Sequence, residues 1–70
     1  MQTFARVVDI SRSGVGLLLQ QPIDEGTRVK IRIDDTAIFG SVRYCNGCPD
    51  GTFRAGVASD TVVADSAVRD

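Results

Sequence analysis

Residues 27–33, TRVKIRI, alternate between apolar and cationic side chains without a break from Arg28 to Ile33. Successive side chains of an extended strand point to opposite faces. The three apolar side chains therefore share one face, and the three cations keep the other face in water. The segment predicts a half-buried β-strand, and 70 residues leave room for one small domain built from such strands.

Other segments rich in β-branched and aliphatic residues predict further strands at residues 3–10, 15–20, 36–45 and 52–58. Turn-forming residues separate these segments at residues 21–26, 34–35 and 46–51. Gly40 predicts a bend or bulge inside its strand. The pattern predicts an all-β fold, a small antiparallel barrel or sandwich, over residues 1–58.

Residues 59–70 differ in character from the predicted strands. Asp60 is a candidate N-cap for a short helix that would carry Val63 and Ala67 on one face. A frayed C-terminal tail is the alternative.

Charge and hydropathy exclude several classes of protein. The net charge is −1, whereas general nucleic-acid binders carry a clear basic excess, so we expect no DNA or RNA partner. No run of eighteen apolar residues is present, so we expect no membrane span. The N-terminal residues lack the layout of a signal peptide, which favours a cytoplasmic location.

Cys45 and Cys48 form one C-x-x-C pair. A structural zinc site needs four ligands, and the chain has no histidine and no second cysteine pair. A redox pair is expected beside a βαβ pattern, which is missing, so we expect two reduced thiols near a turn and no metal. No catalytic constellation or cofactor motif is visible either, which predicts a protein that is not an enzyme.

The segment DISRSG, residues 9–14, joins two predicted strands with more polar side chains than a turn needs. Asp9 can accept two parallel N–H bonds, such as those that guanine presents at N1 and its exocyclic N2. The hydroxyl of Ser11 can donate or accept beside it. Gly14 tolerates positive φ and lets the backbone approach a flat ligand. A ligand site and a plain polar turn with side-chain capping both fit these residues.

The spacing D-x-S-x-x-G, carried by Asp9, Ser11 and Gly14, resembles the second signature of the PilZ domain family. The resemblance continues through ARVVDISRSGVGLLL, the loop with Gly26, the Gly40-x-Val42 strand and GTFRAGV at 51–57. It implies a small bacterial β-barrel that binds cyclic di-GMP as a signalling receptor. It also implies that Asp9, Ser11 and Gly14 contact this ligand.

The family's first signature, R-x-x-x-R, has no counterpart here, because Arg6 is the one arginine before the motif. We therefore expect a barrel that is incomplete, in which Arg12 is a possible additional ligand contact. Arg54 could act similarly, although it fits a solvated strand face. The alternative function is a degenerate PilZ-like module that binds a protein effector and no nucleotide. An exposed strand edge near residues 4–10 predicts a homo-oligomer formed by strand pairing.

Overall fold

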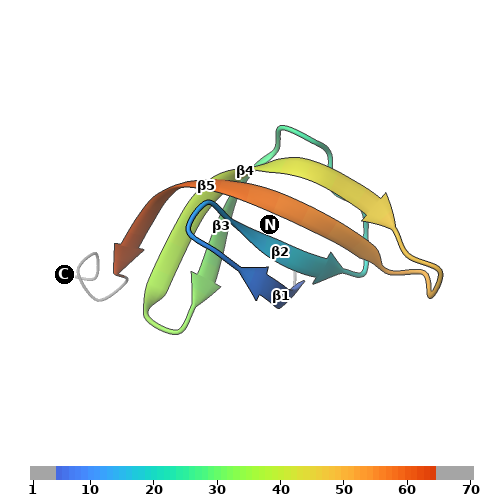
Figure 1. Cartoon of the computed structure of the whole chain (residues 1–70), viewed down its shortest axis with the longest axis horizontal. Coiled ribbons are helices and arrows are strands. Elements are labelled where there is room, and N and C mark those ends of the chain that lie inside the picture. Colours follow the sequence, from blue (N-terminus) through green and yellow to red (C-terminus); the bar gives the residue numbers. More distant parts are fainter. Residues whose placement is uncertain (1–4, 65–70) are drawn as a thin grey trace.

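The computed structural model describes residues 5–64, which form five antiparallel strands in one sheet (Figure 1). The strands are β1 (Ala5–Ile10), β2 (Gly14–Leu19), β3 (Arg28–Ile33), β4 (Thr36–Gly47) and β5 (Phe53–Ala64). Their order across the sheet is β1-β2-β5-β4-β3. The predicted all-β antiparallel fold is confirmed. The sheet is open within the described residues, with β1 and β3 at its two edges.

The last strand is longer than the sequence predicts. β5 continues through Ala64, so the prediction of a short helix or tail is wrong for residues 59–64, and residues 65–70 lie outside the described part. The physical reason is the pairing of Thr61, Val62 and Val63 with the first residues of β4. β-Branched side chains fit a pleated sheet well, and this long-range pairing outweighs the local signal for a helix cap.

The core lies on one face of the sheet. Val15, Leu17 and Leu19 of β2 are buried there, while the residues between them face the other side. Ala55 and Val57 of β5 continue the buried cluster across the sheet. The apolar residues of β3 pack against this cluster, as the alternation in residues 27–33 predicts. In Figure 1 the long strands β4 and β5 arch across the molecule, with β1 and β2 below them in this view.

Three one-residue irregularities interrupt the ladders. The pairing skips Val8 on β1, Arg43 on β4 and Asp60 on β5. The predicted irregularity at Gly40 is confirmed, although the extra residue is Asp60 on the neighbouring strand. Gly40 is required there because a Cβ would overlap the backbone of Ala58, whose carbonyl carbon lies 2.9 Å away.

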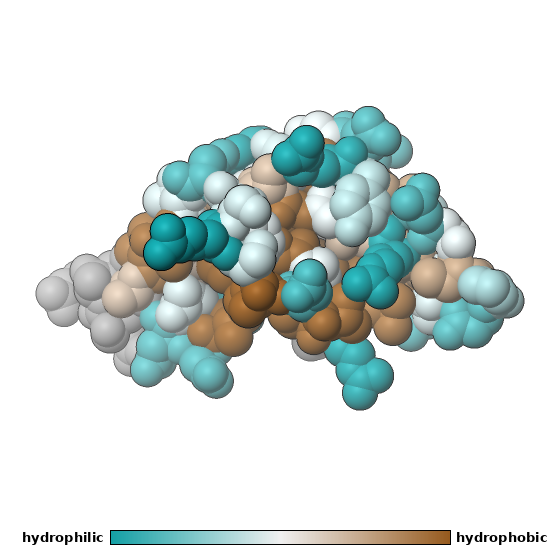
Figure 2. Space-filling view, in the orientation of Figure 1, coloured by the Kyte–Doolittle hydropathy of each residue, from teal (hydrophilic) through white to brown (hydrophobic). Residues whose placement is uncertain are grey.

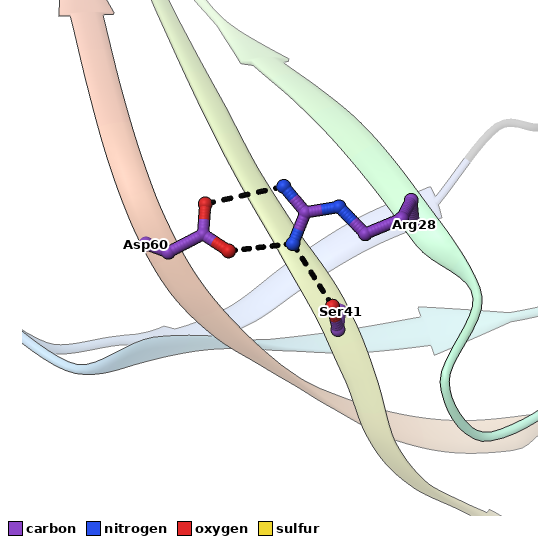
Figure 3. Close-up of polar contacts among 3 residues, drawn as sticks. All are labelled: Arg28, Ser41 and Asp60. Carbon is purple, nitrogen blue, oxygen red and sulfur yellow. Dashed lines mark hydrogen bonds and ion pairs between the residues drawn. The ribbon is translucent and has the colours of Figure 1, made fainter.

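The extra residue on β5, Asp60, forms an ion pair with Arg28 of β3 (Figure 3). Arg28 donates to both carboxylate oxygens of Asp60, with Nη2 at 3.2 Å from Oδ1, and to the Oγ of Ser41 at 3.0 Å. The hydrogen bond from Arg28 and the guanidinium charge hold the pKa of Asp60 below its usual range. Both side chains are more than half exposed, so the pair adds little to stability.

The turns match the sequence pattern. Asp34 and Asp35 form the two-residue connection between β3 and β4, and Asp34 adopts a φ of 52°, which aspartate tolerates better than most residues. In the turn after β4, Asp50 Oδ1 accepts hydrogen bonds from the backbone N–H and the hydroxyl of Thr52. These two bonds, the hydroxyl first, lower the pKa of Asp50. The described residues contain no helix that could cross a membrane.

Candidate functional site: a glycine-floored groove

A row of four paired residues crosses the sheet on the face opposite the core. Asp9 of β1 lies opposite Gly16 of β2, Gly16 lies opposite Gly56 of β5, and Gly56 lies opposite Tyr44 of β4. The two central residues have no side chains, so backbone forms a flat floor between a carboxylate and an aromatic ring. This row defines the candidate site.

The Tyr44 ring lies directly over the floor. A Cβ built on Gly56 would lie 2.6 Å from Cζ and 2.9 Å from Cδ2 of that ring. Gly56 is therefore buried by the ring, although its strand face points away from the core. Tyr44 as a whole is 42% exposed, so a flat partner can still reach it.

Two bulges place the walls of the groove. In a regular strand, neighbouring residues point to opposite faces. The extra residue at Arg43 lets both Arg43 and Tyr44 line the groove. On β1 the extra residue at Val8 lets Val8 and Asp9 both face Gly16, and of these two Asp9 lines the groove. Val8 Cγ2 and Asp9 Cβ both approach Gly16, at 3.5 and 3.2 Å from the position that a Cβ would occupy there. β-Bulges are known to re-aim side chains beside binding sites.

The groove has a volume of about 260 Å³ and opens to solvent. Its polar walls come from three places along the chain: the end of β1 with the following turn, the bulge of β4, and β5. The lining side chains that can bind a ligand are Asp9, Ser11, Ser13, Arg43, Tyr44 and Arg54.

The structure brings the predicted residues Asp9, Ser11 and Gly14 together around the groove, whereas Arg12 is exposed and is not part of its lining. Arg54, for which a solvated strand face was the favoured interpretation, is exposed and also lines the groove. Sequence reasoning did not single out Tyr44. The sequence did contain one signal for it. Tyr44 ends the predicted strand 36–45, and the next predicted strand, 52–58, carries Gly56, which marks a place where another group can approach the backbone closely.

Hydrogen bonds fix the turn that carries the two serines. Ser11 N–H donates to the carbonyl of Gly14 at 2.9 Å, and Ser59 N–H donates to the carbonyl of Ser13 at 3.1 Å. The Ser11 hydroxyl lies 3.4 Å from the Gly14 carbonyl, a long and weak bond that leaves its lone pairs available to a ligand.

Gly14 is required for a different reason from the one the sequence suggests. The described residues with positive φ are Gly26, Gly51 and Asp34, so Gly14 does not use the left-handed region. A Cβ on Gly14 would instead overlap the backbone carbonyl of Val57. The glycine therefore allows β2 to pair closely with β5 at the mouth of the groove.

The chemistry of the groove is divided between its walls. A carboxylate and hydroxyls on the β1 side accept hydrogen bonds, and two guanidinium groups on the β4–β5 side attract anions. The aromatic ring, which covers Gly56, and the neighbouring Gly16, which has no side chain, suit a flat ring system. Among residues 5–64, no group of three or more His, Cys, Asp or Glu side chains is placed to hold a metal, and both cysteines are free thiols.

The fold is a small all-β domain, and the groove lies on the face of its sheet opposite the core. The family model of the PilZ domain matches residues 2–67, which is nearly the whole chain, and the chain therefore belongs to the PilZ family. PilZ domains are binding domains. Comparison with curated proteins and with solved structures gave no significant match.

Proposed function

We propose that this chain is a non-enzymatic receptor domain that binds cyclic di-GMP in the glycine-floored groove. Many PilZ domains bind this signalling dinucleotide. The observation that carries the proposal is the row from Asp9 across Gly16 and Gly56 to Tyr44, which combines a hydrogen-bond acceptor, a flat floor and an aromatic ring.

Asp9 recognises guanine in this proposal. Its carboxylate accepts the N1–H and N2–H donors of one base, an arrangement that adenine cannot reproduce. Ser11 adds a hydroxyl at the same end of the groove. Hydrogen bonds to a charged group contribute about 1.5–3 kcal/mol each, so the carboxylate supplies much of the base specificity.

Tyr44 and the two arginines of the groove hold the remainder of the ligand. The exposed ring of Tyr44 stacks on a base, an interaction that contributes roughly 1–3 kcal/mol per base. Arg43 and Arg54 approach from neighbouring strands and can bind phosphate oxygens through forked guanidinium groups. These two arginines would provide the positive charge that the R-x-x-x-R signature provides in other members of the family.

The size of the groove sets how the ligand sits. Pockets that enclose drug-sized ligands measure roughly 300–1,000 Å³. A groove of about 260 Å³ is smaller, so it accommodates one end of a dinucleotide. The second guanine extends beyond the floor into solvent or against another surface.

Isothermal titration calorimetry with cyclic di-GMP and cyclic di-AMP tests the proposal. We expect binding of cyclic di-GMP and at least about tenfold weaker binding of cyclic di-AMP, because adenine lacks the donor pair. Asp9→Asn and Tyr44→Ala should each weaken cyclic di-GMP binding by about 10- to 100-fold. Asp24→Asn is the matched control, because Asp24 is an exposed loop residue that does not line the groove, and this variant should bind like the wild type.

A folded wild-type chain that binds neither dinucleotide would overturn the proposal. That result would favour the second candidate function, a PilZ-like module that binds a protein. The observation in its favour is β1, an edge strand with all six residues exposed.

A further inference from the structure

The edge of the sheet at β1 is open and apolar. Within residues 5–64 this strand pairs on one side, with β2, and Val7, Val8 and Ile10 are 37–55% exposed. Figure 2 shows apolar side chains gathered along the lower margin of the view, where β1 and β2 lie in Figure 1. This edge has no proline or lysine, although it carries Arg6, Asp9 and the bulge at Val8, and its unpaired backbone groups can accept another strand.

The sequence of β1, ARVVDI, is complementary to itself in the antiparallel direction. When two copies pair about the point between Val7 and Val8, Ala5 lies opposite Ile10, and Arg6 lies opposite Asp9. The two-fold symmetry repeats each contact, so one interface contains two such pairs of opposite charges. Opposite charges that face each other across strands stabilise a sheet, and like charges destabilise it.

The bulge at Val8 places the two charged residues of this register on one face, whereas Val7, opposite Leu17, and Val8, beside Gly16, lie toward different faces. In a regular strand, residues 6 and 9 point to opposite faces, because they are an odd number of positions apart. Here Arg6 pairs with Leu18 and Asp9 pairs with Gly16, and those two partners share the outer face of β2. The extra residue thus places Arg6 and Asp9 on one face, where a second copy can meet both. Within the described residues, neither side chain makes an ion pair.

We propose that two copies of this chain associate through antiparallel pairing of their β1 strands, with Arg6 of each copy beside Asp9 of the other. The second copy is the occupant because it presents the same edge with matching charges. Asp9 also lines the groove, so the partner copy's Arg6 adds a cation at the margin of the candidate site. This inference goes beyond the proposed function and stands on the geometry of β1 alone.

A six-residue edge forms a small interface, below the roughly 1,200 Å² typical of stable complexes, so we expect a dissociation constant in the micromolar range. Sedimentation equilibrium without nucleotide, from about 10 µM to about 1 mM, measures it. Arg6→Asp and Asp9→Arg should each weaken the dimer at least about tenfold. Either substitution gives positions 6 and 9 the same charge, and the two-fold symmetry places two such repulsive pairs in the interface. The combined variant Arg6→Asp/Asp9→Arg should restore it.

Lys30→Asp is the matched control, since it makes the same change of charge on the other edge strand, β3. It should leave the dimer within about threefold of the wild type. A monomeric wild type at about 1 mM, single reversals without effect, or a combined variant that fails to dimerise would each overturn the proposal.

Hydrogen exchange of the wild type gives a readout that needs no variant. The outward amides of Ala5–Ile10 should become protected as the protein concentration rises, and equal exchange at all concentrations would contradict the pairing. Because the combined variant lacks the carboxylate at position 9, it should dimerise without binding cyclic di-GMP. The dimer and the proposed receptor function can therefore fail independently.

Discussion

The contact between Tyr44 and Gly56 can be tested by adding one methyl group. In Gly56→Ala, the new Cβ would lie 2.6 Å from Cζ of the tyrosine ring, far inside van der Waals contact. The backbone of β5 is fixed on both sides by β2 and β4, so the strand cannot yield. The ring of Tyr44 must therefore leave the floor of the groove.

Two opposing effects set the size of the change. Forcing a side chain out of a packed position costs about 1–3 kcal/mol. Replacing glycine with alanine inside a strand returns about 0.5–1 kcal/mol. Gly56→Ala should therefore lower the free energy of unfolding by up to about 2.5 kcal/mol. In a Tyr44→Ala background the three ring atoms nearest to the new Cβ are gone, and the same substitution should raise the free energy of unfolding by about 0.5–1 kcal/mol.

Urea unfolding of the wild type, the two single variants and the double variant completes a thermodynamic cycle. We expect a coupling free energy of about 1–3 kcal/mol between positions 44 and 56, with similar m-values throughout. Gly47→Ala is the control on β4, because its Cβ would lie 3.7 Å from the nearest atom of Phe53, an ordinary contact. If Gly56→Ala has the same effect with and without the tyrosine, the ring does not rest on the floor and the reasoning is refuted.

Three further predictions concern other parts of the sheet. Gly14→Ala should destabilise the fold by about 1–3 kcal/mol, because the backbone carbonyl of Val57 cannot move aside; an unchanged midpoint in urea would contradict this. The pair of Arg28 and Asp60 should stabilise the protein above about pH 4, the usual pKa of the unfolded carboxyl, and this contribution should disappear as the pH falls through the lowered folded pKa. Thermal melts of Asp60→Asn and wild type should therefore converge at acid pH, and a gap that widens there would be evidence against the pair. Replacing Cys45 and Cys48 with serine and alanine should leave cyclic di-GMP binding intact, because neither thiol has an assigned role. Stoichiometric zinc in the purified wild-type protein would contradict that prediction.

The sequence predicts the strands well because one buried face imposes a period of two on each of them. The alternation at residues 27–33 corresponds to β3 within one residue of its ends. The end of β5 was missed because the pairing of residues 61–64 with the start of β4 is a long-range contact that local propensity does not contain.

The sequence identifies the groove residues next to β1 and does not identify those on β4. Asp9, Ser11 and Gly14 lie within six residues of one another, so a local motif identifies them, and the structure places all three at the groove. Arg43 and Tyr44 reach the groove because a bulge interrupts the alternation of β4. A bulge depends on how two distant strands pair, so periodicity within one strand cannot reveal it.

The bulge on β4 also affects how relatives of this chain can differ in length. Arg43 has no partner in the β4–β5 ladder, whereas Val42 lies opposite Val57 and Tyr44 lies opposite Gly56. Deleting Arg43 would therefore leave a regular strand with the same register on both sides. Family members one residue shorter at this point would keep the aromatic wall and lose one cation. A sequence alignment that allows gaps only in loops would shift every residue of such a relative by one position, from the deletion to the next turn. The tyrosine of the relative would then be aligned with Arg43 of this chain.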